Sequence, residues 1–427
     1  MAGGNGMTIA ASILVLTYAV IVTEKFNKAI IALLGASLVI YAGILSQESA
    51  IEGVDFNTIG LLIGMMIIVA ISQKTGMFQY LAIKGAKFVK GEPWGILVML
   101  SLITATASAL LDNVTTVLLI VPITLLITDE LKINPYPFLF MQIFASNIGG
   151  TATLIGDPPN IMIGSAAKLT FMDFVINVAP VIPVVMITTI VPIKFIFGKE
   201  MVVEERLKLG IMKFDEREAI KDIRLLKKSL LILAIVTTGF IFQRQLHLEP
   251  ATIAMAGAAI LLLISGENLH EVFKEVEWVT IFFFVGLFIV VAGVEETGLI
   301  KLMAQKMMTM TDGDMVVTAF VITWLSAVMS AFVDNIPFVA TMIPMIKDIG
   351  EIAGSQEAIK PLWWALSLGA CLGGNGSIIG ASANVIVVGI ADRSGTPIKF
   401  LKFMKLAFPL MLWSILISWI YIYLRYF

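Results

Sequence analysis

The sequence predicts an all-α polytopic membrane protein made of two inverted repeats, each with five spans, a re-entrant helical hairpin and a broken helix. Three observations support this fold class. The 427-residue chain is 58% hydrophobic and only 14% charged, whereas about 25% of the residues in a soluble domain are charged. Apolar runs reach about 15–20 residues, the length needed to cross a hydrocarbon core of about 30 Å. The second half of the chain also repeats polar motifs of the first half.

The apolar segments set out the order of the predicted elements. In the first half they lie at residues 8–23, 28–46, 57–72, 94–128, 136–164 and 174–197. A stretch with nine Lys or Arg and seven Asp or Glu follows at 198–228 and predicts a solvated, partly helical linker. The apolar segments then resume at 229–243, 250–265, 278–293, 316–346, 361–390 and 407–424. We therefore expect one repeat over residues 1–197 and a second over 229–427.

Five motif matches in the same order indicate an internal duplication. Asp112-Asn113 recurs as Asp334-Asn335, 222 positions later. The Gly-rich stretch 149–160 recurs at 373–384, 224 positions later. The other three matches pair residues 31–36 with 253–258, 55–64 with 277–286, and 74–76 with 296–298.

The number of crossings predicts that the repeats are inverted. The segments 94–128 and 316–346 are long and have a polar break in the middle, which favours hairpins that enter and leave by one face. The broken helices at 136–164 and 361–390 each count as one span, so five crossings remain per repeat and the second repeat is upside down. With the termini outside and the linker cytoplasmic, 22 of the 29 Lys and Arg residues fall inside, as the positive-inside rule requires. We expect a multi-pass protein of the plasma or inner membrane.

Composition excludes several other classes of protein. No basic tract predicts nucleic-acid binding, and the formal net charge is −2. The single cysteine, Cys371, excludes an internal disulfide, and two loop histidines make a histidine metal cluster improbable. The first apolar segment lacks a charged n-region and a cleavage site, so we expect a retained helix. No Walker loop or nucleophile–base set is present, so we expect no enzyme activity and no cofactor other than bound Na⁺.

The two hairpin tips carry the first candidate binding residues. A charge in the middle of a bilayer costs roughly 2.5–3.5 kcal/mol on insertion scales, yet both tips place Asp beside Asn. Non-helical backbone at this depth must be buried in protein or line a cavity. Asp112 and Asp334 could bind a cation, exchange a proton, or only cap the following helix. Thr115 and Thr116 add hydroxyls in the first repeat, where the second has Pro337 and Phe338.

The broken helices carry the second group. Gly-Gly followed by small polar residues favours unwinding, and the freed carbonyls are hard ligands for an ion such as Na⁺. Helix packing is the alternative role of the glycines. Asp157 is asymmetric, because Ala381 occupies the matching position. It is a candidate proton or cation site, or a helix cap. Asn147 has no polar match, since Cys371 stands in its place.

These motifs resemble the ion transporter superfamily. The stretches Ala145–Asn160 and Gly369–Asn384, with Leu111–Thr116 and Val333–Pro344, look most like its P-protein-like branch, which is grouped with ArsB arsenite permeases and NhaD-type antiporters and has a citrate-transporter-like domain. The resemblance implies a scaffold part, a carrier part with hairpins and broken helices, a homodimer and an elevator motion. It also implies that Asp112 and Asp334 replace the serine of the Ser-Asn-Thr tips of sodium–dicarboxylate carriers, which argues against dicarboxylate substrates.

We therefore expect a secondary active transporter for a small inorganic ion or an oxyacid such as arsenite, coupled to H⁺ or Na⁺. A Na⁺/H⁺ antiporter, a sodium-coupled carboxylate or anion transporter, and a passive anion channel remain alternatives. An arsenite permease would take a separate ATPase subunit as partner. The expected Na⁺ ligands are Asn113, Thr151, Asn335 and Asn375. The expected binding residues are Asp112, Asn113, Thr115, Thr116, Asn147, Gly149, Gly150, Thr151, Thr153, Asp157, Asn160, Asp334, Asn335, Gly373, Gly374, Asn375, Ser377 and Asn384.

Overall fold

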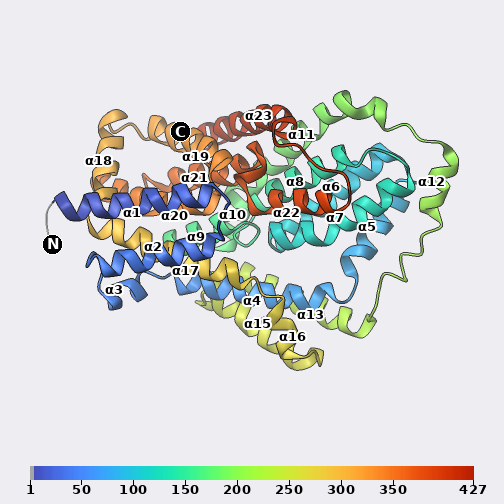
Figure 1. Cartoon of the computed structure of the whole chain (residues 1–427), viewed down its shortest axis with the longest axis horizontal. Coiled ribbons are helices and arrows are strands. Elements are labelled where there is room, and N and C mark those ends of the chain that lie inside the picture. The colour runs from blue at the N-terminus through green and yellow to red at the C-terminus, as the bar shows by residue number, and fades with distance from the viewer. Residues whose placement is uncertain (1–3) are drawn as a thin grey trace.

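The computed structural model describes residues 4–427, and within that range it contains α-helices and short 3₁₀ turns but no β-strand (Figure 1). The helices of the first repeat are α1 (Gly4–Val22), α2 (Lys28–Tyr41), α3 (Gln47–Glu52), α4 (Phe56–Gln73), α5 (Met77–Phe88), α6 (Pro93–Leu110), α7 (Asn113–Glu130), α8 (Tyr136–Thr151), α9 (Pro158–Ala167), α10 (Phe171–Asn177) and α11 (Ile182–Phe197). The linker contains α12 (Glu205–Met212). The second repeat comprises α13 (Ile223–Ile241), α14 (Gln243–Leu246), α15 (Pro250–Ser265), α16 (Leu269–Lys274), α17 (Trp278–Glu296), α18 (Leu299–Met310), α19 (Met315–Phe332), α20 (Asn335–Ala353), α21 (Lys360–Gly373), α22 (Ser382–Arg393) and α23 (Phe400–Tyr426).

The predicted duplication appears in the helix starts. Helices α2, α4, α5, α6 and α7 begin at residues 28, 56, 77, 93 and 113, and α15, α17, α18, α19 and α20 begin at 250, 278, 299, 315 and 335, each 222 positions later. Helix α13 begins at Ile223, inside the stretch predicted as linker, because Asp222 accepts hydrogen bonds from the backbone N–H groups of Arg224 and Leu225 and so caps the helix.

The hairpins and broken helices have the predicted form. Helices α6 and α7 turn at Leu111 and Asp112, and α19 and α20 turn at Val333 and Asp334. Figure 1 places α5, α6 and α7 toward one end of the molecule and α18 and α19 toward the other, as expected for inverted repeats. Helix α8 is separated from α9, and α21 from α22, by non-helical or 3₁₀ segments. Eight helices of the described chain are long and apolar enough to cross a membrane, α6, α7 and α19 among them.

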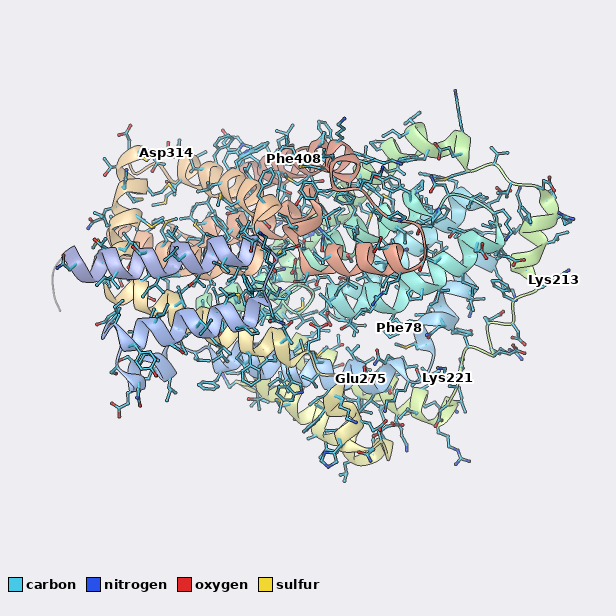
Figure 2. The ribbon with its side chains drawn as sticks, in the orientation of Figure 1. Phe78, Lys213, Lys221, Glu275, Asp314 and Phe408 are labelled. Atoms are coloured by element: carbon cyan, nitrogen blue, oxygen red, sulfur yellow. The ribbon has the colours of Figure 1, made fainter. Side chains whose placement is uncertain are left out.

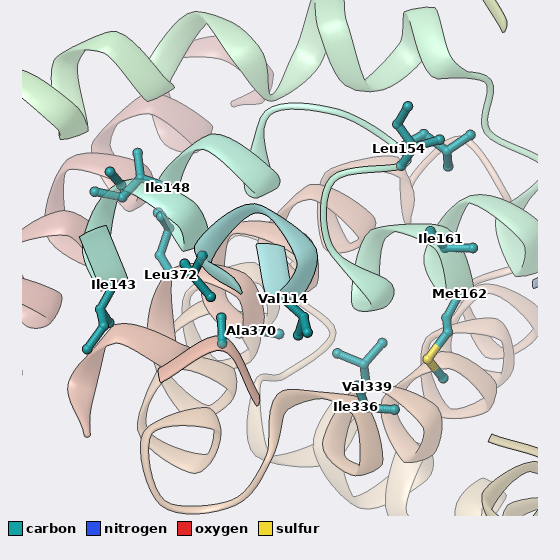
Figure 3. Packing of buried hydrophobic residues seen from close by; sticks show 14 of the residues in the cluster. Val114, Ile143, Ile148, Leu154, Ile161, Met162, Ile336, Val339, Ala370 and Leu372 are labelled. Carbon is teal, nitrogen blue, oxygen red and sulfur yellow. The ribbon is translucent and has the colours of Figure 1, made fainter. Parts of the chain in front are cut away.

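The helices pack into two groups. One, called here the α4–α17 bundle, contains α1 to α4, α13 and α15 to α17, where α4 packs on α15 and α2 on α17. The other, called the hairpin bundle, contains α6 to α9, α11 and α19 to α23. Figure 3 shows apolar side chains of the hairpin bundle, including Val114, Ile148 and Val339, packed together around the hairpin α7 and α20 helices. Helices α5 and α18 connect the bundles within each repeat.

The linker lies at the end of the molecule opposite both termini (Figure 1). Its labelled residues Lys213 and Lys221 lie near the same end as Phe78, at the start of α5 (Figure 2). Lys87 of α5 donates to Glu216 of the linker at 2.5 Å. That hydrogen bond lowers the pKa of the Glu216 carboxyl below its ordinary value. Lys208 likewise donates to Glu92 at 2.5 Å, so polar contacts fix the linker to the α5–α6 connection.

Two glycines make the crossings of the α4–α17 bundle possible. A Cβ on Gly64 would lie 2.7 Å from the backbone of Ala254, and one on Gly286 would lie 2.5 Å from the backbone of Ala32. The two contacts are equivalent under the repeat. Small residues at such crossings let helix backbones approach closely in a membrane.

We expect Gly64→Ala and Gly286→Ala each to lower the melting temperature of the purified protein by several degrees, because overpacking costs about 1–3 kcal/mol. The control is Gly389→Ala, where a Cβ would meet no atom within 4 Å. Melting followed by intrinsic fluorescence in detergent tests this, and three equal melting temperatures would contradict the crossing described here.

Candidate functional site

The two hairpin tips meet the breaks of α8–α9 and α21–α22 around a cavity in the middle of the protein. This central cavity measures about 30 Å³ and is lined by both tips, with Asp112, Asn113, Asp157, Asn335 and Ser382 among its residues. A water molecule needs roughly 10–15 Å³ on the same measure. The cavity therefore has room for one or two waters or a small ion.

Asp112 caps α7. Its backbone is extended, and its two carboxylate oxygens accept from the backbone N–H of Thr115 at 2.7 Å and from the Thr115 hydroxyl at 2.6 Å. The Thr116 hydroxyl donates to the Asp112 carbonyl at 2.8 Å. Asp112, Thr115 and Thr116 therefore use their polar atoms on one another and shape the first tip.

Asp334 has different partners, although it occupies the matching position. Its Oδ1 accepts from the backbone N–H of Ile336 at 3.2 Å, while its Oδ2 accepts from Lys28 at 2.8 Å and from the Ser382 hydroxyl at 3.3 Å. Sequence reasoning missed Lys28. The signal was its position: a lysine begins the second span where the matching span of the other repeat begins with Pro250.

A chain of asparagines connects the first tip to both broken helices. Asn113 donates to Asn147 and to Asp157, each at 3.3 Å. Asn147 in turn donates to Asn375 at 3.0 Å and to Asn384 at 2.9 Å. All five side chains are buried. The chain therefore joins the two repeats at the centre of the protein.

Asn160 and Asn384 hold the broken helices in their unwound form. Asn160 donates to the carbonyls of Thr151 and Thr153 at 3.0 and 2.9 Å. Asn384 does the same to the carbonyls of Gly374 and Ser377, at 2.7 and 2.8 Å. These side-chain amides replace the helical N–H donors that the carbonyls lost at the breaks. Buried backbone carbonyls need such hydrogen-bond donors.

Cys371 has the role in one repeat that Asn147 has in the other. Asn147 donates to the Asn384 side-chain oxygen, and Cys371 donates to the Asn160 side-chain oxygen at 3.5 Å. The Ser367 hydroxyl donates to the same Asn160 oxygen at 2.7 Å. Each broken helix thus holds the asparagine of the other repeat. Sequence comparison treated Cys371 as a non-polar substitute and missed this crossed pattern.

The remaining predicted residues position backbone. The hydroxyls of Thr153 and Ser377 donate to the carbonyls of Ala109 and Ala331, one in each hairpin. Thr151 donates to the Asn147 carbonyl at 2.6 Å. Glycines at the breaks allow close contact, since a Cβ on Gly149 would lie 2.1 Å from the Ala105 oxygen and one on Gly373 would lie 2.6 Å from the Ala327 oxygen. Gly150 and Gly374 similarly face the backbone of Gly156 and Gly380.

Three buried polar atoms at this centre have no hydrogen-bond partner. They are Asp157 Oδ2, Asn335 Nδ2 and Asn375 Nδ2. Asp157 is fully buried, and no ion pair to it is found among residues 4–427. Buried polar groups left unpaired are costly, so these atoms mark where a ligand can bind. The same region holds no group of three or more His, Cys, Asp or Glu side chains suited to a metal ion. Any cation would thus be held by at most two carboxylates, together with amide, hydroxyl and carbonyl oxygens.

The central cavity is reached from the linker end. A cavity of about 790 Å³, called here the linker-side cavity, includes Lys274 and Glu275 beside α16 and shares Val114, Glu277, Thr280 and Ser382 with the central cavity. On the opposite side, a cavity of about 390 Å³ lies between α4, α9, α17 and α20 and shares no lining residue with the central one. The central cavity therefore adjoins the linker-side cavity and not the cavity on the opposite side.

We expect Asn147→Ala to lower the melting temperature by several degrees, because it leaves the oxygens of Asn375 and Asn384 without their donor, at about 1–3 kcal/mol for each unsatisfied group. Asn268→Ala is the control, since Asn268 caps the short exposed helix α16. Thermal unfolding in detergent measures both. If Asn147→Ala melted with the wild type, the asparagine chain would not stabilise the centre.

Comparison with known proteins agrees with this architecture. The family model described as "Citrate transporter" matches residues 18–369. The chain is 44% identical to an uncharacterized transporter of Mycobacterium tuberculosis over 98% of both proteins, and 32% identical to the P protein of Homo sapiens over 97% of this chain and 59% of that protein. The crystal structure of the YdaH transporter of Alcanivorax borkumensis superposes with a TM-score of 0.58 at 14% identity, covering 88% of this chain and 86% of the other. The chain is a multi-pass membrane transporter and belongs to the citrate transporter family.

Proposed function

We propose that the protein is a secondary active transporter that moves a small inorganic ion or an oxyacid such as arsenite, coupled to H⁺ or Na⁺. The observation that carries this proposal is Asp157, a fully buried carboxylate at the central cavity with one oxygen unpartnered. Its position matches Ala381 in the other repeat, so the fold itself does not need an acid there.

Electrostatics supports a coupling role for Asp157. The penalty for burying a single charge is still several kcal/mol after the protein relaxes. Asn113 donates to one oxygen of Asp157 at 3.3 Å, and no lysine or arginine pairs with it in the part of the chain described. The carboxylate is therefore stabilised by taking up a proton or a small cation. It releases the proton or cation when water enters the site and solvates the charge. Exchange of this kind couples a gradient to movement of the site.

The arrangement of cavities supports alternating access. The central cavity shares four lining residues with the linker-side cavity and none with the opposite one. Because the hairpin bundle carries the site and the α4–α17 bundle flanks it, we propose an elevator motion in which the hairpin bundle moves past the other. By resemblance we also propose a homodimer, with a separate ATPase subunit only if the substrate is arsenite.

Two alternatives keep the same site. In a Na⁺/H⁺ antiporter, Asp157 would exchange the two ions directly, which the small size of the central cavity favours. A sodium-coupled carrier of citrate or another carboxylate would need the tips to separate, because about 30 Å³ does not hold a tricarboxylate. A passive anion channel fits less well, since the linker-side cavity contains Glu24, Glu275, Glu277 and Asp334 against Lys28 and Lys274.

In proteoliposomes, we expect Asp157→Asn to lower gradient-driven uptake by more than about tenfold, since it removes the exchangeable charge, equivalent to at least about 1.4 kcal/mol. Asp112→Asn is the matched control and should stay within about threefold of the wild type, because Asn caps a helix as well as Asp does. The substrates supplied are arsenite, phosphate, citrate and radiolabelled Na⁺, each under an imposed Na⁺ or pH gradient.

Wild-type uptake by Asp157→Asn would contradict the role given to this carboxylate. Flux that follows only the electrochemical gradient of the transported ion itself, with no response to either imposed gradient, would support the channel instead.

A further inference from the structure

Lys28 is the charged residue closest to the second hairpin tip. Its ammonium lies 2.8 Å from Asp334 Oδ2 and 2.9 Å from the Ser382 hydroxyl. It also lies 4.8 Å from the centre of the Phe283 ring. The two side chains of the ion pair are only 25% and 14% exposed, so water screens their attraction incompletely.

This ion pair joins the two helix bundles. Lys28 is the first residue of α2, which packs on α1 and α17 in the α4–α17 bundle. Asp334 caps α20 and Ser382 begins α22, and both helices belong to the hairpin bundle. Any movement of the hairpin bundle along the other must therefore separate Lys28 from Asp334.

Among residues 4–427, no lysine or arginine pairs with the first tip. Asp112 caps its own hairpin helix, and the position matching Lys28 is Pro250. The first tip shows that a hairpin of this kind forms without a lysine partner, and the second tip differs because it has one. Lys28 is an addition specific to one of two otherwise equivalent tips.

We propose that Lys28 is a built-in counter-ion that holds the second hairpin tip against the α4–α17 bundle, and that a small cation of the Na⁺ class must take its place on Asp334 before the bundles can separate. This inference rests on the proposed elevator motion. Removing one partner of this half-buried ion pair leaves a carboxylate that water compensates only in part, which is destabilising. The surroundings increase that penalty, because the other titratable groups near Asp334 are mostly acidic: Glu24 before α2, Glu277 before α17 and Asp157 before α9.

Such a replacement makes movement conditional on the cation. With Lys28 in place, the second tip is neutralised and closed. With a cation on Asp334, the tip stays neutral and keeps its local structure, and the hairpin bundle is free to move past the α4–α17 bundle. Without either, the isolated carboxylate opposes the movement, so the empty hairpin bundle does not cycle and the gradient is not dissipated.

Hydrogen–deuterium exchange of the protein in nanodiscs tests this without any transport assay. The readout is the peptide around residues 330–340, because the Ile336 amide bonds to Asp334. Lys28→Met is compared with the wild type in choline chloride and in NaCl at equal ionic strength. We expect exchange of this peptide in Lys28→Met to be about tenfold faster in choline chloride and to return most of the way in NaCl, since a bound cation restores the local free energy of opening.

Two further variants separate the ion pair from general damage. Lys274→Met removes the other lysine of the linker-side cavity, for which no ion pair is found in the described chain, and should leave the peptide protected in both salts. Lys28→Met with Asp334→Asn removes both charges and should lose the dependence on NaCl.

The proposal is overturned if Lys28→Met leaves the peptide as protected as in the wild type, or if NaCl fails to restore protection that was lost. It is also overturned if the double variant keeps the NaCl dependence. Because exchange is measured without substrate, a failure here leaves the flux assay of Asp157→Asn intact, and a failure of that assay leaves this result intact.

Discussion

The structure depends on one constraint: backbone that is not helical in the middle of a membrane must find its hydrogen bonds inside the protein. Each broken helix leaves backbone carbonyls without helical donors. One asparagine in each repeat, Asn160 or Asn384, donates hydrogen bonds to them. Those asparagines are in turn held from the other repeat by Cys371 and Asn147. The hydrogen bonds of the centre therefore need both repeats to be in register.

Once these backbone groups have their hydrogen bonds, few side-chain polar atoms at the centre remain free to bind a ligand. Most of the hydroxyls and amides that look like ligands in the sequence are used on the protein itself: Thr115 on Asp112, Thr153 on Ala109, and Ser377 on Ala331. The atoms left over belong to Asp157, Asn335 and Asn375. Among these unpartnered atoms the carboxylate oxygen belongs to Asp157, which the second repeat replaces with Ala381. Under the proposed function, coupling would be carried by Asp157, whereas Asp112 caps a helix.

The helical fold and the duplication could be predicted from the sequence, because hydropathy and a fixed repeat offset are periodic signals. The glycine-rich breaks are a local signal, and the structure brings them together with the hairpin tips around the central cavity, whose binding role stays a prediction. Sequence reasoning could not separate Asp112 from Asp334, since both occur in the same motif. Both cap a helix, and only the surroundings show that Asp334 also pairs with Lys28. Sequence reasoning also left Cys371 without a role, because the contact to Asn160 spans 211 positions of the chain. Hydrogen bonds between the two repeats cannot be predicted from the sequence of either segment alone.

The central claim is that the buried carboxylate of Asp157 takes up and releases a cation or a proton. The most direct measurement is the charge displaced when proteoliposomes on a solid-supported membrane receive a rapid Na⁺ jump or pH jump. The account predicts a transient current in the wild-type protein for at least one of the two jumps, retained in Asp112→Asn and absent in Asp157→Asn. A current in Asp157→Asn equal to that of the wild type would contradict it.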